Sequence, residues 1–382
     1  MATCAPLIAC LACGEANLEQ VLDLGLQPLA NNFLTEIREQ ENYPLGLNYC
    51  HSCTHLQLTH NVQRSSLFDN YLYVSGTSKT LRDDFANFAR EIHQRWGAQR
   101  ILDIACNDGS QLDEFKKLGW KTLGIDPARN ILDSSIKNHA VICDYLKVEY
   151  AEFLEADIAL AQNVLAHTDD PAQLMKTALE IAEILYVQTS QALMVQNGEF
   201  DTIYHEHLSF FSELSFWTLA QRTSTFLKQI SLRNIHGTSF LFEVSNVGPA
   251  IEKPSGPTPE EAREFGLRSR NTIDKLDQVL SSERSSGSLL IGYGASAKGM
   301  TVLNALETNL DFLIDDSPLK QGRYTPGRNV PVVPVTFLND LTVPVTFVMT
   351  AWNFEKEIRA KIEDHYNGTA HYIKYFPDVV IS

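Results

Sequence analysis

Two CxxC pairs near the N-terminus constrain this chain more than any other feature of its sequence. Cys10 and Cys13 form one pair, and Cys50 and Cys53 form the other. Each pair can present two thiolates on one side of a tight turn, which Gly14 suits. Four thiolates complete the tetrahedron that zinc accepts and leave no open position for water. The pattern predicts a closed, structural zinc site, so the chemistry is expected further along the chain.

Two other interpretations of these four cysteines are open from the sequence. They could be two unrelated pairs of buried thiols, or a redox CxxC, although no thioredoxin-like βαβ pattern is visible. The segment between the pairs is longer than in common zinc ribbons. The other three cysteines, Cys4, Cys106 and Cys143, are scattered. Such usage fits a reducing compartment better than a disulfide framework.

Length and charge bound the function classes. With 382 residues the chain is too long for one ordinary hydrophobic core, so two or three domains are expected. A formal net charge of −16 and the absence of Lys and Arg runs argue against a nucleic-acid partner. No stretch reaches the roughly 18 apolar residues that span a bilayer, and the apolar start lacks the basic region of a signal peptide. We therefore expect a cytoplasmic protein that contacts no membrane.

Strand and helix patterns divide the chain into three units. They predict a zinc-binding module over residues 1–75, a Rossmann-like α/β domain with a parallel sheet over 76–247, and a second Rossmann-like α/β domain over 248–382. The overall fold class is α/β. Helices are predicted over 80–96, 111–118 and 259–282, and strands over 101–104, 121–125, 158–161, 288–291, 312–314, 345–349 and 372–374.

A loop of small and polar residues follows the first strand of the second unit. Ala105 and Gly109 let its backbone approach a ligand, and the next helix points its first N–H groups at an anion or carboxylate. About 20 residues later Asp126 ends the next strand, where nucleotide-binding units hold ribose hydroxyls. The missing GxGxxG disfavours a dinucleotide. An acidic strand end together with a DxxxxDG-like loop is typical of S-adenosylmethionine sites, so this cofactor is expected. The predicted cofactor-binding residues are Asp103, Ala105, Cys106, Asn107, Asp108, Gly109, Asp126, Asp144 and Asn163.

Purely structural roles are the alternative for the same acids. Asp103 could cap the following helix or lie in a satisfied core pocket, and Asp126 could be a turn residue before proline. Asp144 stands where a third strand would end. It could accept a hydrogen bond from the adenine amino group or be an ordinary turn acid.

Residues 204–207, Tyr-His-Glu-His, concentrate the groups that acid–base chemistry needs. His207 could be a general base, Tyr204 a donor to an oxyanion, and Glu206 a group that fixes a histidine tautomer or holds a sugar hydroxyl. A metal site with His205 and a solvated polar loop are the alternatives. His167 follows a strand in the half of the sheet where methyl acceptors meet the sulfonium, so it could reach the substrate, cap a helix or lie in the core.

Glycine-rich residues 292–299 of the third unit join a strand to a helix. Ser296 and Lys298 are the predicted substrate-binding residues, because Lys298 and the helix N-terminus could meet a diphosphate. A Rossmann loop kept only for packing is one alternative. An NAD site is another, but the third glycine is missing from its usual place, and Asp315 and Asp316 support it only weakly.

Together these motifs resemble the sugar C-methyltransferases that act on nucleotide-linked 4-keto-deoxysugars. The resemblance covers nearly the whole chain and rests on the cysteine pairs and on residues 27–31, 103–109, 200–207 and 292–299. It implies a zinc module, an S-adenosylmethionine domain and a C-terminal domain that helps to hold a dTDP-linked sugar, with the active site between them.

The resemblance also implies roles for single residues. His207 matches the base that removes the proton at C3′, after which the carbanion attacks the methyl sulfonium. Its implied neighbours are Tyr204, Glu206, His167 and, from the zinc module, Tyr73 or alternatively Tyr71. Thr238 and Leu241 depart from the family pattern, so methylation of another carbon or an oxygen stays open. A nucleotide-sugar-binding protein without catalysis is a further alternative, and the sequence predicts no oligomeric state.

Overall fold

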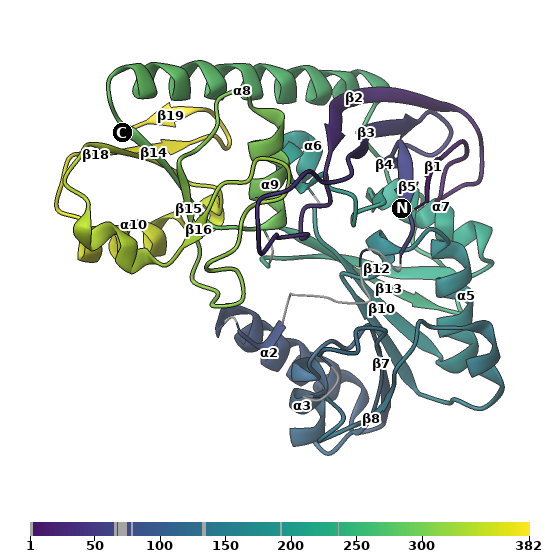
Figure 1. Cartoon of the computed structure of the whole chain (residues 1–382). Helices are drawn as coiled ribbons and strands as arrows, with labels where there is room; N and C mark the ends of the chain where they lie inside the picture. The colour runs from purple at the N-terminus through teal and green to yellow at the C-terminus, as the bar shows by residue number, and fades with distance from the viewer. Residues whose placement is uncertain are drawn as a thin grey trace.

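The computed structural model describes residues 3–64, 67, 75–77, 79–131, 135–191, 193–235 and 237–382. In Figure 1 the purple N-terminal module packs beside a teal α/β unit, and the yellow-green C-terminal unit lies on the opposite side of the molecule. The long helix α8 runs across the top of the view and connects the module with the C-terminal unit.

Two small antiparallel sheets build the N-terminal module. In β3, Leu45, Leu47 and Tyr49 alternate along the strand and are buried, as expected when successive side chains point to opposite faces. One edge strand of the larger sheet, β11, comes from the central unit and pairs with β4. The bounds are β1 Cys4–Pro6, β2 Leu18–Gln27, β3 Tyr43–Cys50, β4 Leu56–Leu58, β5 His60–Val62 and β11 Ser209–Phe210.

The central unit contains the predicted parallel sheet. Its described strands have the order β12-β13-β10-β9-β6-β7-β8, and β6 to β10 are mutually parallel. The order reverses between β6 and β9, and ligands bind open α/β sheets at the carboxyl ends beside such a reversal. Strands β12 and β13 form an antiparallel edge that the sequence analysis did not predict. The bounds are β6 Arg100–Ile104, β7 Lys121–Ile125, β8 Ala140–Ile142, β9 Ile158–Gln162, β10 Ile184–Thr189, β12 Phe226–Arg233 and β13 Ser239–Ser245.

Helices cover both faces of this sheet. The predicted first helix is confirmed as α2, which buries the expected apolar face that includes Phe85, Phe88 and Ile92. Helix α5 begins where Asp170 accepts a hydrogen bond from the backbone of Gln173. The bounds are α2 Lys79–Trp96, α3 Ser110–Lys117, α5 Pro171–Ile181, α6 Met194–Asn197 and α7 Glu213–Arg222, with 3-10 turns at Ser75–Thr77, Val148–Glu152, Leu165–His167 and Phe200–Thr202.

The C-terminal unit is a second α/β sheet, as predicted. Its described strands have the order β16-β15-β14-β17-β18-β19, and all pairs are parallel except β18 with β19. The bounds are β14 Leu289–Tyr293, β15 Phe312–Ile314, β16 Val332–Val333, β17 Val345–Val348, β18 Ala370–Lys374, β19 Val380–Ile381, α9 Ala297–Ala305 and α10 Glu355–His365, with 3-10 turns at Val335–Asp340 and Trp352–Phe354.

Helix α8, Pro259–Ser285, ties the N-terminal module to the C-terminal unit. A capping box formed by Thr258 and Glu261 starts it. Gly266 lies against the carbonyl of Val21 in β2, so closely that an added Cβ would collide with that oxygen. One hydrophobic core contains residues of β2, α8 and β14, so the two outer units are packed together. The boundaries at 75/76 and 247/248 stay a prediction.

Candidate active site and zinc centre

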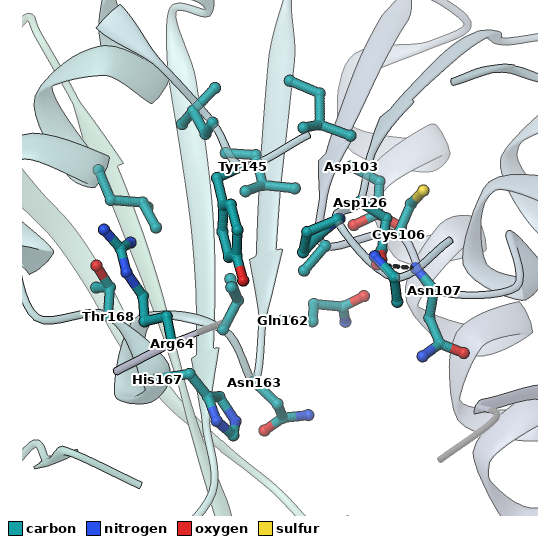
Figure 2. A pocket seen from close by; sticks show the side chains of 18 of the residues that line it. Arg64, Asp103, Cys106, Asn107, Asp126, Tyr145, Gln162, Asn163, His167 and Thr168 are labelled. Atoms are coloured by element: carbon teal, nitrogen blue, oxygen red, sulfur yellow. Dashed lines mark hydrogen bonds between the residues drawn. The ribbon is translucent and has the colours of Figure 1, made fainter. Parts of the chain in front are cut away.

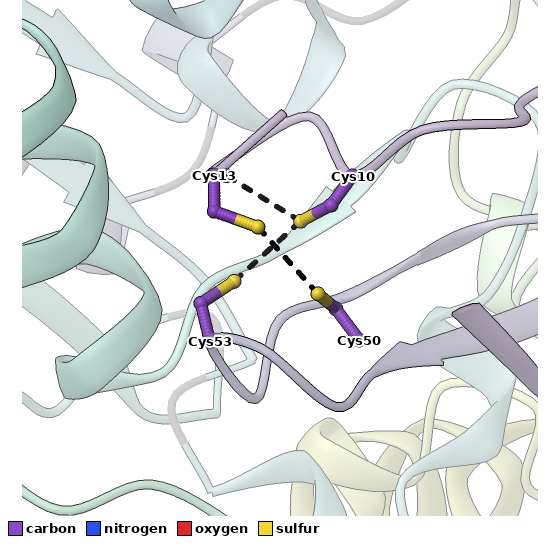
Figure 3. Close-up of side chains that lie close together, drawn as sticks. All are labelled: Cys10, Cys13, Cys50 and Cys53. Atoms are coloured by element: carbon purple, nitrogen blue, oxygen red, sulfur yellow. Dashed lines mark hydrogen bonds between the residues drawn. The ribbon is translucent and has the colours of Figure 1, made fainter. Parts of the chain in front are cut away.

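The four cysteine sulfurs converge in one place, as Figure 3 shows. All lie within 4.8 Å of one another, with Cys10 Sγ 3.5 Å from Cys53 Sγ and Cys13 Sγ 3.6 Å from Cys50 Sγ. A tetrahedral ion with Zn–S bonds of about 2.3 Å places its sulfurs about 3.8 Å apart, so zinc fits. The predicted tetrathiolate zinc site is confirmed. Because its four positions are filled by cysteine, its role is structural.

The backbone of both turns explains how the cysteines converge. The N–H of Gly14 donates to the carbonyl of Cys10, and the N–H of Thr54 donates in the same way to the carbonyl of Cys50, both at 2.8 Å. Gly14 has a φ of 87° and Thr54 one of 61°, so each turn ends in the left-handed region. The predicted turn role of Gly14 is confirmed, and Thr54 takes the equivalent place without being glycine.

A cavity of about 650 Å³ lies at the carboxyl ends of the central parallel strands. In Figure 2, Asp103, Cys106, Asn107 and Asp126 gather on one side of the view, with Arg64 and Tyr145 on the other. All three units line the cavity, since Arg64 belongs to the N-terminal module and Lys298 to the C-terminal unit. The predicted site residues that line it are Asp103, Ala105, Cys106, Asn107, Asp108, Asp126, Asp144, Asn163, His167, Tyr204, His207 and Lys298.

The loop after β6 and the acid after β7 are held together. Ala105 and Asn107 adopt left-handed φ values of 59° and 51°. The carboxylate of Asp126 accepts hydrogen bonds from the N–H of Asn107 and the N–H of Ala128, each at 2.8 Å and on a different oxygen. Each oxygen keeps a second lone pair for a ribose hydroxyl. Gly109, with a φ of 81°, precedes α3 and turns the chain into that helix.

The charges of this region suit a positively charged ligand. Asp103 is 4% exposed, and burial, followed by the negative charges of Asp126 and Asp108, raises the pKa of Asp103 to about 8. Burial also raises the pKa of Asp126, against the hydrogen bonds that it accepts from the backbone. A nearby cation favours the ionised form of such acids. S-adenosylmethionine, with its sulfonium and ammonium charges, fits this wall.

Asp144 lies just after β8, and Asn163 lies just after β9. The carboxylate of Asp144 accepts from Lys147 Nζ at 2.5 Å and from the hydroxyl of Tyr150 at 2.7 Å, and the bond from Lys147 is the main cause that lowers the pKa of Asp144. Asn163 has a φ of 56°, and its Oδ1 finds no hydrogen-bond partner among the described residues. Contact of Asp144 with adenine stays a prediction.

His207 is placed as a general base would be. Its Nδ1 lies 2.9 Å from the carbonyl of Thr202, which can only accept, so Nδ1 carries the proton. The lone pair is therefore on Nε2, which lies 2.9 Å from the hydroxyl of Tyr204. The ring of His167 packs edge-on at a centroid distance of 5.0 Å. His207 is 6% exposed and reaches the cavity wall.

The other two side chains of the cluster point elsewhere. Glu206 accepts a hydrogen bond from Asn31 Nδ2 at 2.5 Å, so the carbonyl of Thr202, and not Glu206, fixes the tautomer of His207. His205 lies 3.3 Å from the carbonyl of Tyr43, and burial lowers the pKa of His205 to about 4. Among the described residues, the four cysteines of the N-terminal module are the group whose possible metal-ligand atoms lie close together.

His167 is a neutral histidine at the cavity. Burial lowers the pKa of His167 to about 4, although hydrogen bonds with the backbone of Glu206 and Asn163 act in the opposite direction. A neutral ring can donate one hydrogen bond without carrying charge. The predicted Tyr73 and its alternative Tyr71 lie outside the described residues.

The two predicted substrate residues of the C-terminal unit have different roles. Ser296 caps α9 by accepting from the N–H of Gly299 at 3.1 Å. Lys298 lines the cavity with its Nζ 5.2 Å from the ring centre of Trp352. Gly294, at a φ of 108°, packs directly on Ala351, so this glycine is needed for close packing, and substrate binding by the loop stays a prediction.

Sequence reasoning missed several residues that line the cavity, including Arg64, Tyr145, Gln162 and Gln191. Gln162 and Gln191 stand at or just after the ends of β9 and β10, and the rule that sites form at the carboxyl ends of parallel strands could have found them. Arg64 comes from another unit and pairs with Asp169 at 3.3 Å. No local pattern marks such a residue.

Known families match this chain in succession along its length. A putative zinc binding domain matches residues 10–68, a methyltransferase domain matches 59–223, and a C-methyltransferase C-terminal domain matches 251–377. The C-methyltransferase NovU of Streptomyces niveus is 25% identical over 410 aligned residues, which cover 98% of this chain and 96% of NovU.

Solved methyltransferase structures are also similar to part of the chain. The plantazolicin methyltransferase BpumL with SAH and a pentazolic analog matches with a TM-score of 0.38 and 13% identity, over 45% of this chain and 87% of its own. Magnesium protoporphyrin IX methyltransferase of Synechocystis PCC 6803 with bound SAM matches with a TM-score of 0.35 and 10% identity, over 44% and 79%.

The successive domain matches agree with the geometry. The zinc-binding match contains the four converging cysteines. The methyltransferase match contains the loop after β6, together with Asp126 and His207. Among the described residues no helix has the length and apolar character needed to cross a membrane. The chain is a zinc-containing, S-adenosylmethionine-dependent methyltransferase, and its successive domain matches and its similarity to NovU support the C-methyltransferase family.

Proposed function

We propose that this enzyme methylates the carbon next to the keto group of a dTDP-linked 4-keto-deoxysugar. The observation that carries the proposal is the tautomer of His207, which presents a basic Nε2 at the cavity wall. The loop after β6 lines the same cavity. A base is needed because a carbon nucleophile forms only after a proton leaves it.

Residues of the chain can carry the whole proton transfer. His207 takes the proton beside the ketone on Nε2, while its Nδ1–H stays on the carbonyl of Thr202. The hydroxyl of Tyr204 then turns from His207 to the developing enolate oxygen, and the neutral His167 is the second candidate donor. Bound S-adenosylmethionine supplies an electrophilic methyl group.

A nucleotide-linked sugar agrees with the charges of the cavity. The chain carries a net charge of −16, so a diphosphate needs a local cation. Arg64 forms an ion pair with Asp169, and Lys147 forms one with Asp144. Lys298 forms no ion pair with any described residue, which leaves its charge for a ligand. We propose that Lys298 meets the diphosphate.

Two alternatives share parts of this geometry. A base beside a methyl donor also serves transfer to a hydroxyl or to another carbon. The name of NovU, a C-methyltransferase, favours carbon for this chain too. A non-catalytic nucleotide-sugar-binding protein would have no use for a histidine with a fixed tautomer at the cavity wall.

Replacing His207 by asparagine tests the proposal. We expect His207→Asn to reduce turnover by about 10²–10⁴-fold, the usual contribution of a general base, with cofactor affinity nearly unchanged. It should also slow the exchange of the proton alpha to the ketone with deuterated water, measured by NMR. His205→Asn is the matched control, because this neighbouring histidine points away to Tyr43. Exchange at the wild-type rate in His207→Asn would make His167 the leading base.

A further inference from the structure

We infer that Gln191 sets the basicity of His207 by accepting a second hydrogen bond from its Nδ1–H. The inference deepens the proposed function, which it takes as its starting point. Gln191 follows β10 by two residues, is 6% exposed and lines the same cavity. Its terminal amide lies 3.1 Å from Nδ1 of His207.

The hydrogen-bonding groups around Nδ1 decide the orientation of that amide. The carbonyl of Thr202 can only accept, so Nδ1 is a donor. An NH₂ group turned toward Nδ1 would set two donors against each other. A half-turn of the amide places Oε1 against Nδ1–H. Nδ1–H is then shared between two neutral acceptors.

The backbone shows that Gln191 is held in place against its own preference. Its φ is 69°, in the left-handed region that residues with side chains seldom adopt. Its carbonyl accepts from the N–H of Met194, which starts α6. Thr202 is fixed by α6 and the residues just after it, because its hydroxyl contacts Met194 Sδ and donates to the carbonyl of Glu199. Strained residues of this kind cluster at active sites.

The charge on this acceptor determines the sign of any change. A neutral amide stabilises the imidazolium of His207 modestly, a carboxylate would stabilise it more, and a thioether less. Among the described residues, the titratable groups that contact the His207 ring include Tyr204 on its Nε2 side and His167 at its edge. Both are unchanged by substitutions at Gln191, so a shift in opposite directions for two variants isolates Gln191.

The experiment is an NMR titration of His207 in the full-length, zinc-loaded protein labelled with ¹⁵N-histidine, without substrate. We expect Gln191→Glu to raise the pKa of His207 by about 1–3 pH units, the usual effect of a carboxylate at this distance, and Gln191→Met to lower it. Gln188→Glu is the matched control, because Gln188 is a buried amide on β10 outside the cavity lining. It should shift the titration less than Gln191→Glu does.

The results separate this inference from the proposed function. A titration of His207 that is the same in folded Gln191→Glu and in the wild type overturns the inference, as does a shift of equal size in Gln188→Glu. Should Gln191→Glu not fold, an unchanged titration in Gln191→Met overturns it. If the titration moves as expected but the acid limb of kcat/KM does not follow, the inference stands and His207 is not the base.

Discussion

Asp103 shows how burial and function compete at a single residue. Its carboxyl is 4% exposed, and burial is the first cause that raises the pKa of Asp103 to about 8, compared with about 3.9 in an unfolded chain. The folded protein therefore holds a proton that the unfolded chain has released between these two values. Where the native state binds more protons, its stability falls as the pH rises.

This sign leads to a prediction for Asp103→Asn. Without cofactor, the stability of the wild type should fall between about pH 4 and pH 8, while the variant lacks this contribution. The unfolding free energy of the variant, relative to that of the wild type, should rise by at least about 1.4 kcal/mol between pH 5 and pH 9. This is the free energy that corresponds to a pKa shift of one unit. Urea denaturation of both proteins at the two pH values measures the gain. Stability curves that run parallel would show that Asp103 titrates as an exposed acid does.

At this scale the sequence identified residues whose signal is local. Asp103 lies near the carboxyl end of β6 and Asp126 follows β7, at a spacing typical of nucleotide sites, and both line the cavity. Gln191 lies just after β10, a strand that was not predicted, and its contact with His207 depends on a loop that returns to it only in the folded chain. The same holds for Arg64, which reaches the cavity from another unit.

Strand β11 links the zinc-binding module to the loop that carries His207. It begins two residues after His207 and pairs with β4, which follows the second cysteine turn. His55 lies between that turn and β4, fully buried, with one ring nitrogen 3.2 Å from Ser209 Oγ and the other 3.3 Å from Ser215 Oγ. Burial lowers the pKa of His55 to about 3, so the ring is neutral.

We therefore predict that His55→Leu makes the segment of residues 205–211, which contains His207, more mobile without loss of zinc. Both hydroxyls would lose a buried partner, at a cost of about 1–3 kcal/mol each. Amide hydrogen exchange should become faster over residues 205–211, and metal analysis should still give one zinc per chain. His51→Leu is the control, because His51 lies in the second cysteine turn but pairs with the half-buried Glu19. Equal exchange in both variants would mean that β11 is held by other contacts.

Elements were predicted where an apolar run met a turn signal. Strand β9 is such a case, with Ile158 to Ala161 fully buried. Strands β10, β12 and β13 were not predicted, since periodicity alone does not separate short buried strands from other apolar segments. Strand β11 has two residues and exists only through its pairing with the zinc module, so no local pattern could show it.

In the whole molecule, both outer units hold the loop that carries His207. From the zinc module, Asn31 donates to Glu206. From the C-terminal unit, the buried carboxylate of Asp201 accepts from Trp352 Nε1 at 2.7 Å and from the hydroxyl of Tyr375 at 3.0 Å. Burial, together with the charge of Asp201, raises the pKa of Tyr375, so Tyr375 stays a donor. The three-unit architecture therefore positions one short loop.

Trp352→Phe should weaken this hold while leaving an aromatic ring beneath Lys298. The variant removes the indole N–H, and Asp201, which is 2% exposed, keeps only the hydroxyl of Tyr375 among its two donors. Loss of a hydrogen bond to a buried carboxylate costs about 1–3 kcal/mol. We therefore expect a lower unfolding free energy and a several-fold lower kcat. Denaturation and steady-state kinetics measure both.

Trp217→Phe provides the comparison that isolates the hydrogen bond. Trp217 also has a lysine over its ring, with Lys253 Nζ 5.9 Å from the ring centre, but its indole N–H finds no partner among the described residues. The Trp217→Phe variant loses the same atoms as Trp352→Phe but no hydrogen bond to a carboxylate. Its stability and kcat should therefore stay near the wild-type values. If the two variants lose the same stability and activity, the loss comes from ring size alone. Asp201 would then not connect the C-terminal unit to catalysis.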